Sequence, residues 1–191
     1  MKLAMGLVIV AIVVVIIWYA PKYLTYADEP AKSDVIVLFI GLDFNARKKE
    51  AVKLMEEGYA RHLLIPAYGT MITSPTDTIY QPDKQKKQKK PDKPEKPKYF
   101  EDTHIEMLEA KKAIDKAGFK SAIFVSAPFH MRRIKVMATS LFDNDHLNMK
   151  FVPTRFDKRE NGFWLLSTST IENVTREYLK IVWFLTYRMF S

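Results

Sequence analysis

The sequence predicts an α/β domain of three layers, with helices on both faces of a mainly parallel sheet, preceded by one N-terminal transmembrane helix. Short apolar runs rich in β-branched residues alternate with segments whose apolar residues recur at helical spacing. Strands that alternate with helices form right-handed βαβ units, and these units build parallel sheets. An uncharged apolar stretch near the N-terminus indicates the membrane helix.

The predicted membrane helix occupies residues 3–20, which contain no charged side chain. As a helix, this stretch would be roughly 27 Å long, close to the hydrocarbon thickness of a bilayer. Trp18, Tyr19 and Tyr23 fall where an interfacial aromatic belt would lie. We therefore expect residues 1–24 to be a retained anchor. The alternative is a cleaved signal peptide, although the apolar run is long for one.

The charges that flank this stretch do not determine its orientation in the membrane. Lys2 before it and Lys22 after it place one positive charge on each side. A very short N-terminal flank is typical of an anchor whose C-terminal domain is exported. We expect a single-pass protein of the cell membrane, with its globular domain outside the cytoplasm. Residues 25–33 are then a polar linker, and residues 34–191 form the domain.

Composition narrows the function classes. The chain has 191 residues and no cysteine, which excludes disulfides, zinc–thiolate sites and a cysteine nucleophile. Residues 81–98 hold eight lysines against three acidic residues, and so supply +5 of the net charge of +8. The rest of the chain has no basic stripe or aromatic platform, so we expect no nucleic-acid partner.

The lysine run belongs to a longer stretch, residues 70–100, which lacks periodicity and contains five prolines. Such a segment cannot bury enough apolar surface to fold, so we expect a disordered insertion. It is either a solvated loop or an electrostatic tether to acidic wall polymers or anionic lipid head groups.

Four strands are expected, at residues 35–40, 62–66, 123–125 and 149–153. The first, V-I-V-L-F-I, is continuously apolar, which is typical of a central parallel strand. A helix follows each of the first and third strands, another precedes the third, and the last lies near the C-terminus. The patterns T-x-x-E at 103–106 and S-x-x-E at 169–172 predict capping boxes at the starts of two of these helices.

Residues 121–133 predict a strand, a tight turn and the start of a helix; their sequence is S-A-I-F-V-S-A-P-F-H-M-R-R. This arrangement places His130, Arg132 and Arg133 in the first helical turn, where arginines are repelled by the positive end of the helix dipole. An anion bound there would remove this conflict. His130 and Arg133 lie on the same helical face, whereas Arg132 points elsewhere and is expected to be a surface charge.

Loops that follow parallel strands meet at one edge of the sheet, where ligands bind. We therefore expect a ligand site at that edge. Its catalytic candidate is His130. Its ligand-binding candidates are Gly41, Asp43, Arg47, Gly69, Thr103, Glu106, Ser126 and Arg133.

Several candidates also have explanations within the fold, and these alternatives stay open. Asp43 could simply cap its helix. Arg47 could point to solvent. Thr103 and Glu106 could satisfy each other as a capping box. No metal is expected, because the four histidines show no H-x-x-x-H spacing, and no P-loop or nucleophile-elbow motif is present.

Two motifs resemble those of the SanA/ElyC/YdcF-type family. One is R-x-x-x-A-x-x-L-x-x-x-G at residues 47–58, and the other is the H-M-x-R segment at 130–133, preceded by T-x-x-E and followed by E-x-x-K at 177–180. The resemblance covers about residues 33–185. It implies a Rossmann-like fold, a membrane anchor with an exported domain, and a link to envelope integrity and peptidoglycan or lipid-carrier metabolism. One branch of the family is thought to bind an adenosine-containing cofactor.

Three hypotheses about function are consistent with these patterns. The first is binding, with or without processing, of an anionic, phosphate-bearing envelope precursor, with Arg47 and Arg133 neutralising the anion and His130 as donor or general acid. The second is a non-catalytic envelope assembly module, which Tyr68 and Leu42 filling the space above the strand ends would favour. The third is an enzyme that binds a nucleotide or S-adenosylmethionine, and the predicted anchor argues against it.

Overall fold

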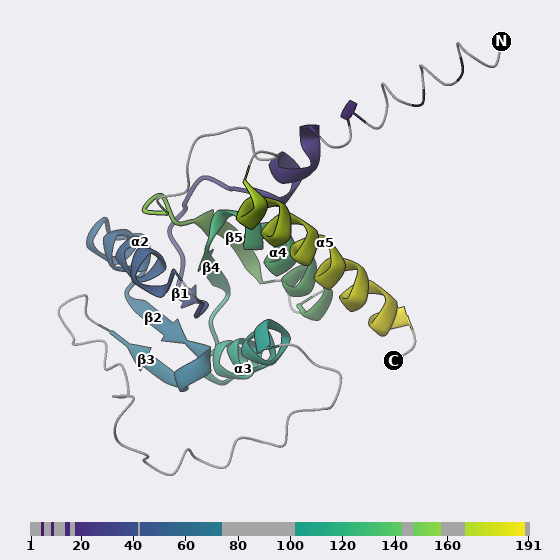
Figure 1. Cartoon of the computed structure of the whole chain (residues 1–191). Helices are drawn as coiled ribbons and strands as arrows, with labels where there is room; N and C mark the ends of the chain where they lie inside the picture. Colours follow the sequence, from purple (N-terminus) through teal and green to yellow (C-terminus); the bar gives the residue numbers. More distant parts are fainter. Residues whose placement is uncertain are drawn as a thin grey trace, which may run out of the picture.

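The computed structural model describes residues 18–41, 43–73, 102–142, 147–157 and 167–189, together with four separate positions between residues 5 and 15. These residues form a mixed α/β domain whose mostly parallel sheet is flanked by helices, consistent with a Rossmann-like fold (Figure 1). Most of the predicted anchor and of the predicted insertion lies outside the described residues. Within them, no helix combines the length and the apolar character that crossing a membrane requires.

The sheet has five strands in the order β3-β2-β1-β4-β5. β1 pairs in parallel with β2 and β4, and β4 pairs in parallel with β5, whereas β3 runs antiparallel to β2. The bounds are β1 Val35–Leu38, β2 His62–Ile65, β3 Thr70–Ile72, β4 Ser121–Ser126 and β5 Asn148–Pro153. The four predicted strands are confirmed.

β3 was not predicted, because its residues were expected to belong to the disordered insertion. A 3₁₀ turn, η1 (Pro66–Tyr68), follows β2 and ends at Gly69, whose φ of 59° is left-handed. Glycine adopts this conformation at no steric cost, which lets the chain reverse direction into β3. The predicted insertion therefore starts too early by at least the three residues of this strand.

The helices form a layer on each face of the sheet. α2 (Phe44–Glu56) covers one face, and α3 (Asp102–Ala117) and α4 (Met131–Leu141) cover the other (Figure 1). β1 supplies both cores, because successive strand residues point to opposite faces. Ile36 and Leu38 belong to the apolar cluster under α2, and Val35 and Val37 to the cluster under α3 and α4.

The last helix, α5 (Thr168–Met189), packs on α4 and also holds residues 18–24. Leu24 is fully buried against Val174 and Ile181. The Tyr178 hydroxyl donates to the carbonyl of Ala20 at 2.8 Å. Figure 1 shows this N-terminal segment beside the start of α5. The end of the predicted anchor is therefore fixed to the domain.

α4 adds a second set of contacts to the same segment. The Arg132 guanidinium lies 4.2 Å from the ring centroid of Tyr23, and its Nε donates to the Tyr23 carbonyl at 2.8 Å. The Lys135 Nζ atom lies 3.6 Å from the ring centroid of Tyr26. Cations over aromatic faces are attractive contacts. Arg132 was predicted to be a plain surface charge. It instead links α4 to the chain that leads to the predicted anchor.

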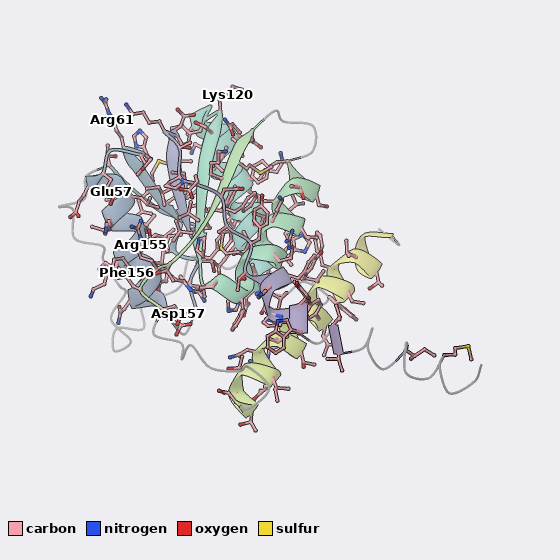
Figure 2. The ribbon with its side chains drawn as sticks, turned by 90° about the horizontal axis from the view of Figure 1, so that it is seen from above. Glu57, Arg61, Lys120, Arg155, Phe156 and Asp157 are labelled. Atoms are coloured by element: carbon pink, nitrogen blue, oxygen red, sulfur yellow. The ribbon has the colours of Figure 1, made fainter. Side chains whose placement is uncertain are left out.

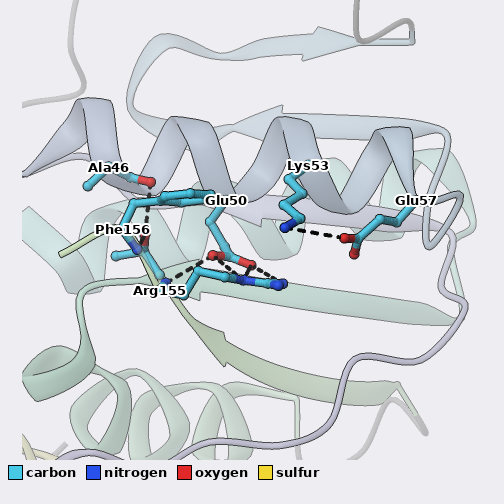
Figure 3. Close-up of polar contacts among 7 residues, drawn as sticks. Ala46, Glu50, Lys53, Glu57, Arg155 and Phe156 are labelled. Atoms are coloured by element: carbon cyan, nitrogen blue, oxygen red, sulfur yellow. Dashed lines mark hydrogen bonds and ion pairs between the residues drawn. The ribbon is translucent and has the colours of Figure 1, made fainter.

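A buried carboxylate ties the end of β5 to α2. Seen from above, Arg155 and Phe156 lie beside α2 (Figure 2). Arg155 donates from Nη2 to Glu50 Oε1 at 2.8 Å and from its backbone N–H to Glu50 Oε2 at 2.9 Å (Figure 3). Glu50 is fully buried, and its hydrogen bonds raise the pKa of Arg155. The pair holds the open edge of the sheet against α2.

Candidate functional site

The predicted site lies where the order of the strands reverses. The chain moves from β1 outward to β2 and β3, then returns to the other side of β1 as β4 and β5. In open α/β sheets, ligands bind outside the carboxyl ends of the strands at such a reversal. Here the reversal lies between the ends of β1 and β4, which pair as Leu38 with Val125. The segments beyond them are residues 39–43 and 127–130.

Glu106 is the carboxylate at the centre of this region. It is buried in α3, and its Oε2 accepts the backbone N–H of Ile40, just beyond β1, at 3.2 Å. Burial raises the pKa of Glu106 from 4.5 to about 7. The hydrogen bond from Ile40 and the positive charges of Arg47 and Arg133 act in the opposite direction and lower this pKa, but by less than burial raises it. This carboxyl therefore changes charge near neutral pH.

Arg47 binds the backbone carbonyls of the same segment, just beyond β1. Its buried guanidinium donates from Nη1 to the carbonyl of Ile40 at 2.7 Å and to that of Phe39 at 3.3 Å. A Cβ atom on Gly41 would lie 2.5 Å from Arg47 Nη2, closer than side-chain carbons approach other atoms. A side chain at position 41 would therefore displace the Arg47 guanidinium, and the ligand-binding role of Gly41 stays a prediction. Arg47 points into the site, which was one of the two predicted alternatives.

Arg133 is buried and paired. Its Nε donates to Glu177 Oε2 at 2.7 Å and its Nη2 to Glu177 Oε1 at 3.3 Å. The same Nη2 lies 2.9 Å from His130 Nδ1. His130 Nδ1 also lies 3.3 Å from Glu177 Oε1. Because a guanidinium can only donate, we assign Nδ1 of the neutral ring as the acceptor from Arg133, with the ring proton on Nε2; in the doubly protonated ring, Nδ1 would instead donate to Glu177. Arg133 is thus the centre of an internal network, and its binding of a ligand stays a prediction.

The structure brings together Arg47, Glu106, His130 and Arg133, and Ser126 is the last residue of β4. Ser126 is buried, and its carbonyl accepts the N–H of Thr154 at 2.9 Å. Within the network of His130, Arg133 and Glu177, the histidine is the accessible member. Its side chain is 28% exposed, whereas those of Arg133 and Glu177 are 2% and 3% exposed.

The remaining predicted residues have roles in the backbone. Asp43 occupies the N-cap position of α2, but its side chain makes no capping hydrogen bond; its carbonyl accepts the N–H groups of Ala46 and Arg47. Gly69 serves the turn into β3. The capping box of Thr103 and Glu106 is wrong, because α3 already includes Asp102 and the Glu106 carboxylate binds Ile40 instead.

The second predicted capping box is displaced by two residues. α5 begins at Thr168, and the hydroxyl of Ser167, not that of Ser169, accepts the N–H of Thr170 at 3.4 Å. The side chain of Glu172 pairs instead with Arg176, one turn further along. The pattern therefore marks the helix start but misassigns the cap.

The sequence offers Glu177, in the E-x-x-K motif, as one of two ion-pair partners for a structural Arg133, the other being Glu106, but not as a site residue; the structure shows that Glu177 is the acid that completes the network. Glu177 lies on the buried face of α5 between Val174 and Ile181. An acidic residue on an apolar helix face must have a partner, because burying an isolated charge is costly. The position of Glu177 three residues after Val174 and four before Ile181, on the apolar face of the helix, is the signal that could have identified it as a buried ion-pair residue. The same reasoning applies to Glu50, which shares the buried face of α2 with Ala51 and Leu54.

The accessible surface at this edge is limited. Tyr68 packs edge to face on Phe44, with ring centroids 6.2 Å apart, and partly covers the region beyond β2. Leu42 lies outside the described residues. Shallow hollows lie on the outer sides of α5 and α2. At this edge, the accessible side chain of the predicted site is that of His130.

The site offers no metal-binding geometry among the residues described: nowhere do three histidine or acidic side chains gather as ligands would. Compared with known proteins, the chain matches no family model, no curated protein and no solved structure.

Proposed function

We propose that this chain is a membrane-anchored envelope protein of the SanA/ElyC/YdcF type, with a Rossmann-like domain outside the cytoplasm that binds an anionic, phosphate-bearing ligand. Its role would lie in cell-envelope or peptidoglycan biogenesis. The H-M-x-R and T-x-x-E motifs support the family, and the strand order supports the fold.

One observation carries the proposal: the site and the end of the predicted anchor adjoin. Phe129 packs on the cluster formed by Leu24, Val174 and Ile181, to which Ala20 also belongs. The next residue is His130, whose Nδ1 contacts Arg133. A ligand that meets His130 therefore lies beside the point where the chain leaves the predicted span. The phosphate of a membrane lipid also lies at the membrane surface, where the chain would leave the predicted span.

The chemistry of His130 suits a phosphate oxygen. With Nδ1 accepting from Arg133, the neutral ring donates from Nε2 to a phosphate oxygen. In the doubly protonated ring, Nδ1 would donate to Glu177 Oε1, 3.3 Å away, and the ring would add positive charge. Arg133 and Glu177 hold the ring and do not contact the ligand themselves. For a phosphate ester that is also cleaved, the doubly protonated His130 would act as general acid, passing its Nε2 proton to the leaving oxygen and remaining as the neutral ring.

A second candidate function, a non-catalytic envelope assembly module, has its own support. Both guanidinium groups bind internal acceptors, and Tyr68 with Phe44 partly covers the strand ends. A nucleotide or S-adenosylmethionine cofactor has less support, because the guanidinium of Arg47 fills the space that Gly41 leaves.

The test is a ligand screen on the full chain in mild detergent. Thermal unfolding is followed with a polyprenyl phosphate, the matching polyprenol, inorganic phosphate, nucleotides and S-adenosylmethionine. A ligand that binds only the folded state raises the melting temperature by mass action. The proposal expects a rise with polyprenyl phosphate and none with polyprenol. Equal effects of the two lipids would contradict it, and a rise with a nucleotide would favour the cofactor alternative.

A further inference from the structure

We infer that the outward side of α5 lies on the lipid surface beside the predicted anchor, so that the domain rests on the membrane through a second, amphipathic element. This inference rests on the membrane anchoring proposed above. We define the outward apolar face of α5 as Leu179, Val182, Trp183 and Leu185.

This face is exposed although α5 already has a buried apolar side, formed by Val174, Ile181 and Phe184. The side chains of the outward apolar face are 45–65% exposed: Leu179 65%, Val182 55%, Trp183 53% and Leu185 45%. A helix at the surface of a soluble domain carries polar residues at such positions. Large contiguous apolar patches mark interaction surfaces.

The outward side also changes in character along the helix. In its first half, that side is polar, with Glu172 paired to Arg176. From residue 178 onward, the sequence contains no acidic residue, and Lys180 lies among the apolar side chains of this side. Tryptophan, leucine and basic residues without acids are typical of helices that lie in the interface of anionic membranes.

A shallow hollow of about 420 Å³ follows the same side of the helix. Its lining combines apolar side chains with two basic residues. The lining residues are Arg176, Leu179, Lys180, Val182, Trp183 and Thr186. A lipid head group and the first carbons of its chains match this combination of cations and apolar surface.

The outward face is continuous with the predicted anchor. Tyr178, on α5, stacks on Tyr23 with ring centroids 6.1 Å apart and hydrogen-bonds to the Ala20 carbonyl. The exposed aromatic residues Trp18 and Tyr19 precede these contacts, and Trp183 follows them on α5. Aromatic rings at both places fit one interfacial belt. The lipid surface, rather than a soluble partner or a second copy of the chain, is therefore the occupant that these contacts favour.

The test uses the absence of cysteine from the chain. Single cysteines replace Val182 on α5, Val15 in the predicted anchor and Lys112 on α3, all of which are exposed positions. Each carries a spin label, and the full chain is reconstituted into vesicles of phosphatidylglycerol and phosphatidylethanolamine. Accessibility to oxygen, which enters lipid, is compared with accessibility to a water-soluble nickel chelate.

The expected result is an oxygen-to-nickel accessibility ratio at Val182→Cys several times that at Lys112→Cys, and similar to that at Val15→Cys. A water-like ratio at position 182 with a lipid-like ratio at position 15 would overturn this inference and leave the anchoring intact. Water-like ratios at both positions would overturn the anchoring too. Protection of position 182 from both reagents, with dipolar broadening between labels, would overturn the inference by showing that a second copy covers the face.

Discussion

The raised pKa of Glu106 makes the stability of the domain depend on pH in a way that one variant can isolate. We expect Glu106→Gln to be more stable than the wild type at alkaline pH, and the gap to close as the pH falls. The glutamine side chain has the shape of a protonated glutamate, and its amide oxygen can still accept the Ile40 N–H. It cannot ionise.

The magnitude is set by linkage. The folded-state pKa is about 7 and the ordinary value is 4.5. A raised carboxyl pKa means that the folded state keeps a proton that the unfolded chain has lost between these two values. Stability is therefore highest below pH 4.5, falls as the pH rises towards 7, and stays low above it. The wild type should trail Glu106→Gln by about 1 kcal/mol at pH 5 and by about 3 kcal/mol at pH 8.5.

The assay is urea unfolding of the full chain in mild detergent, followed by circular dichroism from pH 5 to 8.5, with linear extrapolation of the free energy of unfolding. Glu109→Gln is the matched control, because Glu109 lies on the same helix but is exposed beside Lys112. That control should shift stability little, at any pH. If the wild type instead gained stability over Glu106→Gln as the pH rose, Glu106 would be an ionised partner of Arg47 and Arg133, and the reasoning would be wrong.

Three further predictions concern the internal contacts, each measured by the same unfolding experiment. Arg133→Ala should lose roughly 3–5 kcal/mol by leaving Glu177 buried without its cation, whereas Arg133→Met with Glu177→Leu should recover most of the loss; a cost below about 1 kcal/mol for the single variant would contradict a structural pair. Gly41→Ala should cost about 1–3 kcal/mol, because the new methyl group displaces a buried guanidinium; an unchanged midpoint would refute this. Glu50→Ala should cost roughly 1–3 kcal/mol, and the exposed control Lys53→Ala less than about 0.5 kcal/mol; equal losses would show that the pair of Glu50 and Arg155 contributes nothing.

The sequence was sufficient for most of the fold because the principal strands are apolar runs with clear ends. β1, β2, β4 and β5 could be identified in this way. β3 could not, since three residues show no period and the strand is defined only by pairing with β2 after the turn at Gly69. Its place beside a proline- and lysine-rich stretch concealed it further.

The position of the site could be predicted from the sequence, but its hydrogen bonds could not. Parallel topology alone places Arg47, Glu106 and Arg133 at one edge, and they do gather there. Their hydrogen-bond partners depend on packing between distant elements. Arg133 meets Glu177, 44 residues away, because α5 packs on α4. The T-x-x-E pattern misled for the same reason, since a peptide N–H beyond β1 took the place of the predicted cap.

The proposed function depends above all on His130 meeting a lipid-borne phosphate at the edge of the membrane. The most direct measurement is phosphorus-31 NMR of a polyprenyl phosphate in detergent, titrated with the full chain and with His130→Asn. Asparagine supplies an acceptor to Arg133 in place of Nδ1 but nothing in place of Nε2, so the internal network survives while the donor is lost. We expect a saturable change of the phosphate resonance with the wild-type chain and little or none with His130→Asn. The same change with both proteins, or with neither, would contradict the proposed role of His130.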